Sequence, residues 1–485
     1  MKVAIAYPPI IKNGRYPLLS QNRQFRYSSS PYVKIFPLVP ASAATLLKEA
    51  GHQVLWLDGV NERLSIQTFW GRLNAFSPDL VVMETKTPVL AHHWSWVKNL
   101  AEAGFKTVLM GDHVTANPEE SLANSPVDYV VGGGDYDVAL LGLVDHLERG
   151  SPLSAGIYFR RYGRVESSGS PQLTANLDAL PVIDRELTQW HIYGEAYLHH
   201  PCAYILTGRG CGGGPQGPGR CAFCVWQHTL WQRTRRLRSP KKVVQEIKTL
   251  AERYRVREVF DDNESGGVWN QEWLEAFCQE MKREGLVGRV YFSCNARGDS
   301  LTPERCRLMK EGGFRLLKVG LESGNEETLL RLHKGESLED IVRGVKTAKE
   351  HGLCVLLTTM TGYPWEKEED AEKTYQVTKK LMLYNTQLGD SLQSSVLVPY
   401  PGTPLYRECL ERGWFDIDPR DYSQYDMSHP VLRCSFDAMA WCDQMWNIHK
   451  HPLFLLKTLL QVRSRDDITL LGRGVTSLLG HNKDF

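Results

Sequence analysis

Two successive runs of short apolar segments, each alternating with amphipathic stretches, dominate this sequence. In the first run the candidate strands are VAIA (3–6), VLWL (54–57), LVVM (80–83), TVLM (107–110) and YVV (129–131). Stretches with helical spacing lie between them at 41–50, 91–103 and 138–147. Strands that are apolar on both faces and separated by helices predict an α/β domain over residues 1–150. We expect a doubly wound, Rossmann-like parallel sheet that binds ligands at the carboxyl ends of its strands.

A second alternation begins near residue 204. Its candidate strands are YILT (204–207), EVFD (258–261), VYFS (290–293), LLKVGLE (316–322), VLLTTM (355–360) and SVLVP (395–399). Six β/α units in about 200 residues predict a partial (β/α)6 barrel, with its chemistry at the carboxyl ends of the strands. We place this barrel at residues 196–405. A linker with a hairpin (151–195) precedes it, and a mainly helical cap (406–485) follows it.

Composition excludes several classes of protein. The chain has 485 residues, of which 42% are hydrophobic and 23% charged, as expected for a globular protein of two to four domains. Its net charge of +1 argues against a nucleic-acid partner, and we interpret the basic run WQRTRRLRSPKK (231–242) as a solvated link. No apolar run is long enough to span a membrane, and MKVAIAYPPI lacks the features of a signal peptide. We therefore expect a cytoplasmic protein with no membrane partner, whose thiols are reduced.

Three cysteines, Cys211, Cys221 and Cys224, occupy the glycine- and proline-rich stretch CGGGPQGPGRCAFC directly after the first strand of the second run. A cluster of thiols in a reducing compartment favours a metal centre over a disulfide. A structural zinc site normally needs four protein ligands, and His228 is a candidate for the fourth. Three thiolates can instead hold a [4Fe–4S] cluster and leave one iron free for an outside ligand. Both metal centres remain open on this pattern.

The motif TGRGC…CAFC resembles the cluster loop of the radical S-adenosylmethionine (SAM) enzymes, in which an aromatic residue precedes the last cysteine. The order of FDDNESG, CNARGD, KVGLESGNEETLLRLHKG, TGYPWE and VPYPGTPLY is similar to that family as well. The first 150 residues resemble the cobalamin-binding domain of one branch, through PLVPASAATLLKEAGH, GDHVT and VDYVVGGGDYD. Two features depart from the pattern. Nine residues separate the first two cysteines where the family usually has three, and no Asp-x-His-x-x-Gly motif for cobalt ligation follows the first strand.

The resemblance implies three cofactors: a [4Fe–4S] cluster, SAM and cobalamin. The implied cluster ligands are Cys211, Cys221 and Cys224. The residues implied to contact SAM are Phe223, Asp262, Arg297, Glu322, Ser323 and Tyr363. The residues implied to line the cobalamin site are Thr85, Thr87, Gly111, His113, Thr115, Gly132, Gly133 and Gly134. Helix capping, turn formation and core packing remain alternative roles for many of these residues, and no catalytic side chain is assigned.

The implied activity is that of a cobalamin-dependent radical SAM C-methyltransferase, a transferase acting on an unactivated carbon of a small-molecule or natural-product intermediate. The resemblance implies that a 5′-deoxyadenosyl radical and methylcobalamin carry the reaction. The implied partners are a small-molecule substrate and an external electron donor of flavodoxin or ferredoxin type. Two alternatives stay open. One is a cobalamin-containing radical SAM enzyme that cyclises, rearranges or oxidises its substrate without methyl transfer, and the other is a cobalamin- or redox-sensing binding protein.

Overall fold

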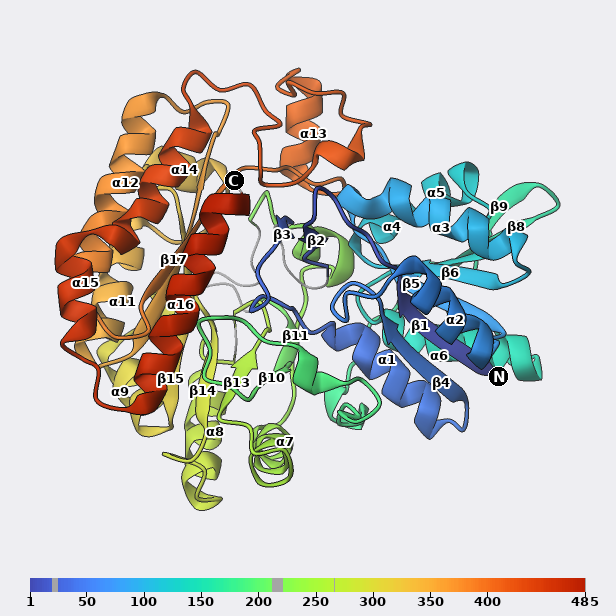
Figure 1. Cartoon of the computed structure of the whole chain (residues 1–485), viewed down its shortest axis with the longest axis horizontal. Helices are drawn as coiled ribbons and strands as arrows, with labels where there is room; N and C mark the ends of the chain where they lie inside the picture. Colours follow the sequence, from blue (N-terminus) through green and yellow to red (C-terminus); the bar gives the residue numbers. More distant parts are fainter. Residues whose placement is uncertain (20–24, 212–220, 266, 485) are drawn as a thin grey trace.

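The structure is a computed structural model that describes residues 1–19, 25–211, 221–265 and 267–484, with side chains described to residue 477. The glycine-rich part of the cysteine loop, residues 212–220, lies outside the described residues. Figure 1 shows two α/β lobes side by side: the first 150 residues form one, and the barrel with the C-terminal helices forms the other.

The first lobe contains a seven-stranded sheet with the order β4-β1-β5-β6-β7-β8-β9. Its strands are β1 (Lys2–Tyr7), β4 (Gln53–Asp58), β5 (Leu80–Glu84), β6 (Lys106–Met110), β7 (Tyr129–Val131), β8 (Ile157–Arg161) and β9 (Arg164–Ser167). The first five pair in parallel, which confirms the predicted doubly wound sheet. The predicted hairpin forms as β8 and β9, and it extends this sheet by pairing antiparallel to β7.

Helices cover both faces of this sheet, which is why its strands are apolar throughout. The longer ones are α1 (Leu38–Glu49), α2 (Ile66–Phe76), α3 (Leu90–Glu102) and α6 (Tyr136–Arg149). Two short helices, α4 (Asp112–Ala116) and α5 (Pro118–Asn124), follow β6. The sequence pattern predicted α1, α3 and α6. It did not predict α2, in which only Phe69 and Leu73 are buried.

The second lobe contains a six-stranded parallel sheet whose strands follow chain order. They are β10 (Cys202–Ile205), β13 (Glu258–Asp261), β14 (Tyr291–Ala296), β15 (Phe314–Glu322), β16 (Cys354–Thr361) and β17 (Ser391–Val396). The partial (β/α)6 barrel is therefore confirmed. β17 begins at Ser391, four residues before the apolar run that predicted it. The sequence pattern missed this start because the strand buries Ser394, whose hydroxyl contacts the sulfur of Met445.

Helices on the outside of the barrel follow the predicted order. They are α7 (Pro240–Arg253), α8 (Gln271–Arg283), α9 (Pro303–Glu311), α10 (Glu326–Arg331), α11 (Leu338–Glu350) and α12 (Glu368–Leu383). Local sequence fixes where most of them begin, because a polar side chain accepts a hydrogen bond from the first turn. The capping residues of this kind are Ser239, Asn270, Thr302, Asn325 and Ser337.

The C-terminal part is mainly helical, as predicted, and contains α13 (Pro404–Glu411), α14 (Ala438–Trp446), α15 (Pro452–Leu459) and α16 (Arg465–Asp484). Trp446 on α14 donates from its indole nitrogen to the carbonyl of Ser394, which fixes this helix against β17. In the part of the chain that the structure describes, no helix combines the length and the apolarity that a bilayer crossing requires.

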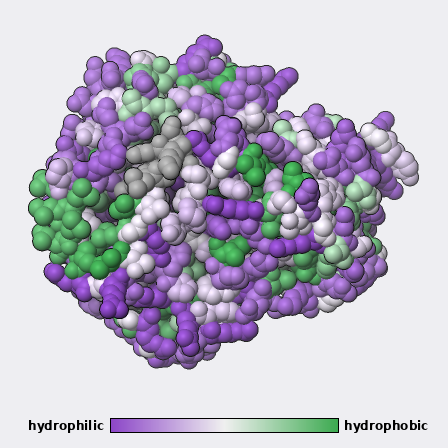
Figure 2. Space-filling view, in the orientation of Figure 1, coloured by the Kyte–Doolittle hydropathy of each residue, from purple (hydrophilic) through white to green (hydrophobic). Residues whose placement is uncertain are grey.

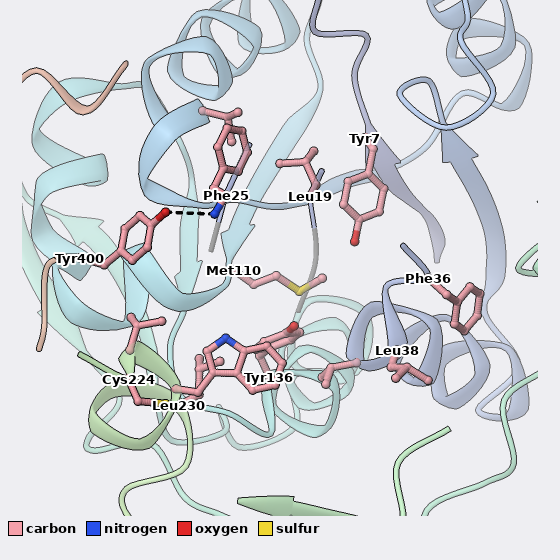
Figure 3. Close-up of a cluster of buried hydrophobic side chains, with 14 of the residues drawn as sticks. Tyr7, Leu19, Phe25, Phe36, Leu38, Met110, Tyr136, Cys224, Leu230 and Tyr400 are labelled. Carbon is pink, nitrogen blue, oxygen red and sulfur yellow. Dashed lines mark hydrogen bonds between the residues drawn. The ribbon is translucent and has the colours of Figure 1, made fainter. Parts of the chain in front are cut away.

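One hydrophobic core joins the two lobes. It contains Tyr7, Met110 and Tyr136 from the first lobe together with Leu230 and Tyr400 from the second lobe. Figure 3 shows these side chains gathered in one cluster, with the Tyr400 hydroxyl accepting from the backbone N–H of Phe25 at 3.1 Å. The carboxyl ends of both sheets therefore contribute to the same packed interior.

Candidate active site

A cavity of about 170 Å³ lies at the carboxyl ends of the barrel strands. All three cysteines of the loop line it, together with four of the six residues predicted to contact SAM and with Lys334. These lining residues are Cys211, Cys221, Cys224, Asp262, Arg297, Glu322 and Lys334. Phe223, the aromatic residue before the last cysteine, lines it as well. The fold therefore brings the cysteine loop and most of the predicted SAM residues to one place, at the edge where such barrels hold their chemistry.

Backbone hydrogen bonds hold the turn that carries Cys221 and Cys224. The N–H of Ala222 donates to the carbonyl of Leu332 at 2.8 Å, and the N–H of Leu405 donates to the carbonyl of Ala222 at 3.1 Å. The N–H of Cys224 donates to the carbonyl of Cys221 at 3.0 Å. Segments from α10 and α13 thus fix both sides of the turn before any ligand is bound.

Cys211 is positioned from the other end of the loop by a two-stranded ribbon, β11 (Gly208–Gly210) and β12 (Arg235–Leu237). Gly210 has φ of +96°, and a Cβ atom there would overlap the carbonyl of Thr234. Its N–H donates to the Glu264 carboxylate at 3.1 Å. Glycine is required at this position because the strand turns sharply, just before the first cysteine, in a conformation that other residues rarely adopt.

His228 does not complete a zinc site with the cysteines. Its Nε2 donates to the carbonyl of Cys221 at 3.2 Å, and its Nδ1 accepts from Arg233 at 3.4 Å. Both ring nitrogens are therefore engaged. Among the described residues, no group of three or more His, Cys, Asp or Glu side chains is arranged to hold a metal ion. Of the two metal centres left open by the sequence, the zinc site with His228 is not supported.

Lys334 supplies a buried positive charge beside Cys221. Its Nζ lies 3.3 Å from Glu322 Oε1 and 3.2 Å from Glu336 Oε1. Burial lowers the pKa of Lys334, but the two carboxylates outweigh it and raise the pKa above its ordinary value. Burial raises the pKa of the Cys221 thiol to about 12, against the opposing effect of Lys334. The cavity thus holds a cation where thiolates would carry negative charge.

Arg297 lines the cavity, but its guanidinium is already bound by the protein. Its Nε and Nη2 donate to Asp299 at 3.1 and 2.9 Å. Its Nη1 donates to the carbonyl of Lys334 at 2.9 Å and its Nη2 to that of Gly335 at 3.1 Å. In this structure Arg297 therefore holds in place the segment that carries Lys334, and its fork faces Asp299.

Glu322 ends β15 with φ of +63°, an unusual conformation for a residue other than glycine. A bulge between Gly320 and Glu322 accompanies it, and such bulges re-aim side chains at strand ends. The side chain reaches the cavity and meets Lys334 there.

Ser323 and Tyr363, both predicted to contact SAM, are buried and are not among the residues that line the cavity. The Ser323 hydroxyl donates to Glu366 at 2.8 Å, and the Tyr363 hydroxyl donates to the carbonyl of Glu322 at 3.5 Å. Burial raises the pKa of Glu366 to about 7. These residues support the strand end that carries Glu322.

Asp262 lines the cavity, whereas its neighbour Asp261 is buried. The Asp261 carboxylate accepts from both the N–H and the hydroxyl of Thr207, at 2.9 and 2.5 Å, which links β13 to the end of β10. Burial raises the pKa of Asp261 to about 6. Of the two neighbouring aspartates, only Asp262 is placed to meet a ligand in this cavity.

The predicted cobalamin residues lie at the carboxyl edge of the first sheet, where they contact one another. His113 Nδ1 is 3.0 Å from the Thr87 hydroxyl, and its Nε2 is 3.0 Å from Glu120. The Thr115 hydroxyl donates to the carbonyl of Gly111 at 2.6 Å and accepts from the N–H of Gly133 at 3.0 Å. Both nitrogens of His113 are thus engaged within the protein.

The glycines of this edge face protein atoms. A Cβ at Gly111 would overlap the backbone carbonyl of Thr85. Thr85 is fully buried, and its side-chain hydroxyl has no hydrogen-bond partner among the described residues. A Cβ at Gly133 would overlap Pro171, and one at Gly134 the indole of Trp231. Gly132 lies beside the ring of Tyr158.

Three large side chains fill the space in front of this edge. They come from the segment that directly follows Cys224, which contains a single π-helical turn at Trp226–Leu230. Trp226, Leu230 and Trp231 are all buried, and a cavity of only about 10 Å³ lies between them and Tyr136. These three side chains occupy the space in front of Gly134 in this structure.

Comparison with known proteins identifies the second lobe. Residues 205–377 match the family model described as the Radical SAM superfamily. This part of the chain, the barrel of the second lobe, is therefore a radical SAM domain. A chain with this domain is an enzyme of the radical SAM type, and the domain forms the barrel of the second lobe.

The chain is similar over most of its length to several characterised or named proteins. It is 28% identical over 404 residues to an uncharacterized methyltransferase of Pyrococcus horikoshii, which covers 82% of this chain and 83% of that protein. It is 24% identical over 436 residues to the anaerobic magnesium-protoporphyrin IX monomethyl ester cyclase of Rubrivivax gelatinosus, covering 88% and 75%. It is 24% identical over 469 residues to the hopanoid C-3 methylase of Methylococcus capsulatus, covering 92% and 83%.

Two solved structures share the whole fold. The radical SAM methyltransferase TsrM of Kitasatospora setae, solved with cobalamin and a [4Fe–4S] cluster bound, superposes with a TM-score of 0.70 at 16% identity over 99% of both chains. The cobalamin-dependent radical SAM enzyme OxsB, with aqua-cobalamin bound, gives 0.67 at 16% identity over 99% of this chain and 72% of its own. The architecture is therefore that of cobalamin-dependent radical SAM enzymes.

Sequence reasoning missed two parts of the site. Lys334 lies inside the motif KVGLESGNEETLLRLHKG, but nothing in the spacing shows that its side chain reaches the cysteines. Arg209, in TGRGC, forms ion pairs with Asp135 and Asp137 of the first lobe. An arginine two residues before the first predicted cluster ligand was the available signal, but its partners lie more than 70 residues away in the chain.

Proposed function

We propose that the chain is a cobalamin-dependent radical SAM C-methyltransferase acting on an unactivated carbon of a small molecule. The observation that carries the proposal is the cavity at the carboxyl ends of the barrel strands, where Cys211, Cys221 and Cys224 meet the charged residues Glu322 and Lys334. Three cysteines suit a [4Fe–4S] cluster with one open iron. When bound, this cluster and SAM supply a one-electron cleavage that makes a hydrogen-abstracting radical.

The residues around the cysteines fit SAM. Asp262 and Glu322 offer carboxylates to its amino group and ribose hydroxyls, and Phe223 gives an apolar surface next to the cluster. Lys334 offers a cation to the SAM carboxylate or to the thiolates. Arg297 can bind the SAM carboxylate only if that carboxylate takes the place of Asp299, to which the guanidinium now donates. Ser323 and Tyr363 act through the strand end they support.

Cobalamin is proposed from the shared fold, and the first sheet provides the loops for it. In this structure Trp226, Leu230 and Trp231 occupy the space in front of this edge, so we derive no step through the ring. Its entry requires Trp226, Leu230 and Trp231 to leave the edge that Gly134 and Tyr136 form. When bound, cobalamin supplies a methyl group.

A second candidate function is ring closure or oxidation without methyl transfer. The similarity to the magnesium-protoporphyrin cyclases over 88% of this chain favours it, because those relatives carry a name for a different reaction on the same domain arrangement. The mass of the product separates the two, since methylation adds about 14 Da.

The test is anaerobic turnover of the reconstituted enzyme with methyl-labelled SAM and a reduced flavodoxin or ferredoxin as the electron donor. These reducing conditions are those of the cytoplasm, where we propose that the enzyme acts. We expect 5′-deoxyadenosine from the wild type and none from Cys221→Ala. Cys434→Ala is the matched control, because Cys434 is partly exposed and outside the cavity. Equal iron content and 5′-deoxyadenosine in Cys221→Ala and the wild type would contradict the proposal, and cofactor binding without SAM cleavage would favour a sensing protein.

A further inference from the structure

Five leucines on one short helix and its C-cap are exposed together. Four lie on α15 and the fifth, Leu460, is its C-cap. The exposed fractions of Leu453, Leu455, Leu456, Leu459 and Leu460 are 51%, 46%, 54%, 62% and 63%. Figure 2 shows a continuous hydrophobic patch at the left side of the molecule, where Figure 1 places α15. We call these five residues the leucine face. Contiguous apolar patches of this kind are rare on monomers and mark binding surfaces.

Basic residues flank the leucine face. Lys450, Lys457, Arg463 and Arg465 are all exposed. The sequence contains no Asp or Glu between residues 444 and 465, and Asp466 and Asp467 are engaged by Arg257 and by the N-cap of α16. A helix with an apolar face and Lys/Arg neighbours is typical of segments that lie in the interface of a membrane with anionic lipids.

A second cavity of about 200 Å³ opens beside this helix. Mainly apolar side chains of β17, α14, α15 and α16 line it, including Leu392, Trp446, Phe454, Leu470 and Leu471. Leu455 and Val475 line the cavity and are also exposed, at 46% and 55%. The mouth of the cavity therefore lies at the leucine face.

The second cavity also borders the cavity of the cysteine site. The two cavities share four lining residues: Ile35, Glu195, Tyr197 and Gln393. The second cavity and the cysteine cavity are therefore separated by no more than these side chains. A molecule that entered at the leucine face could place one end near the cluster while its apolar body stayed among the C-terminal helices. This is the geometry that an elongated, mostly apolar substrate needs.

We propose that the leucine face docks on the surface of an anionic lipid bilayer and that the second cavity takes the apolar body of a lipid from it. The helix lies on the bilayer without crossing it, in contrast to the expectation from sequence that membranes play no part. The docking stands on its own observations, whereas the assignment of a lipid as substrate rests on the proposed function. A second copy of the chain is the competing occupant, but the basic flank of the leucine face repels an identical surface.

The first test is sedimentation of the full chain with vesicles of phosphatidylglycerol and phosphatidylcholine, and with phosphatidylcholine alone. We expect binding to the anionic vesicles that falls with salt, and at least a tenfold lower bound-to-free ratio for Leu456→Glu/Leu459→Glu. Ile66→Glu/Leu330→Glu is the matched control, because both residues are exposed apolar residues outside this patch. Wild-type protein that stays in the supernatant overturns the proposal. So does a wild-type dimer that the leucine variant turns into monomers.

The second test measures binding of cis-parinaric acid, a fluorescent long-chain fatty acid, to the cavity. A Cβ at Gly474 or at Gly472 meets no atom within 4 Å, but only Gly474 lines the cavity. We expect Gly474→Phe to weaken parinarate binding at least tenfold and Gly472→Phe to leave it unchanged. Equal binding in both variants overturns the lipid pocket. Parinarate binding by a wild type that fails to cleave SAM instead refutes the proposed function and leaves the lipid pocket standing.

Discussion

Arg209 links the cluster loop to the first lobe, and its replacement is the sharpest test of how the two lobes depend on each other. It lies on β11, two residues before Cys211. Its Nη1 is 2.9 Å from Asp135 and 2.9 Å from Asp137, and its Nη2 is 2.6 Å from Asp137. Burial lowers the pKa of Arg209, but the two aspartates outweigh it, so the guanidinium stays charged.

The magnitude follows from what Arg209→Met leaves behind. Asp135 keeps its ion pair with Arg236 at 2.6 Å, whereas Asp137 keeps only the Ser42 hydroxyl at 2.6 Å and a backbone N–H. Removing one partner of a buried ion pair typically costs about 3–5 kcal/mol, because an uncompensated charge remains. Since Asp135 stays paired, we expect a loss near the lower end, about 3 kcal/mol in the free energy of unfolding.

A second variant separates the charge effect from lost packing. In Arg209→Met/Asp137→Asn the orphaned charge is gone while the Ser42 hydroxyl retains an acceptor, so we expect about 1–2 kcal/mol to be recovered. The control is Arg283→Met, which removes an exposed pair with Glu280 and should change stability by less than about 0.5 kcal/mol.

The assay is denaturant unfolding of the apoprotein together with iron content after reconstitution. Both should fall in Arg209→Met, because the β11 end that carries Cys211 loses its anchor. The reasoning is refuted if Arg209→Met costs no more than Arg283→Met, or if the double variant is no more stable than the single one.

Three further predictions concern single side chains. Burial raises the pKa of Glu366 from 4.5 to about 7, so its contribution to stability is full below pH 4.5 and is lost as the pH rises through 7. Glu366→Gln should therefore gain on the wild type in thermal melts between pH 5 and pH 8, by up to about 3 kcal/mol, and a pH-independent difference would contradict this. Trp231→Ala should lower the free energy of unfolding by about 3–5 kcal/mol and speed the uptake of hydroxocobalamin. Uptake is measured as corrin absorbance of the protein after gel filtration. Unchanged uptake would mean that Trp231 does not close the sheet edge. Lys334→Met should lower the iron retained after reconstitution and Lys334→Arg should restore most of it, whereas equal iron in both variants would exclude a role for the charge.

The strands were predictable from sequence because their signal is local. Buried strands of a parallel sheet are apolar on both faces. VAIA and LVVM can therefore be recognised as strands from their own residues alone. The strand β17 departs from this rule, since it buries the serines at 394 and 395 against α14 and other neighbours. Polar residues in a strand are satisfied by partners distant in sequence, and no local pattern shows them.

In the candidate site too, some features can be predicted from local sequence and others depend on the tertiary fold. Cysteine spacing and the aromatic residue at 223 predict a cluster loop, and the structure brings these residues to one cavity. The roles of His113 and Gly134 depend on what the tertiary fold places opposite them, which here is Glu120 and Trp231. Sequence identified the residues at the sheet edge and could not show that the chain's own side chains cover it.

The segment 225–231, which covers the carboxyl edge of the first sheet, also connects the predicted cobalamin region to the predicted cluster region. Cys224 is followed at once by the π-helical turn that carries Trp226 and Leu230, and Trp231 packs on Gly134 of the first lobe. The other end of the cysteine loop is joined to the same lobe by the ion pair of Arg209 with Asp135, which directly follows Gly134 in the loop 132–135. A ligand that displaces Trp231 must therefore act on the turn that holds Cys224, because the chain between them is short and packed on both sides. We therefore expect occupancy of the sheet edge to change the geometry of the three cysteines, because one continuous stretch of backbone joins the two places.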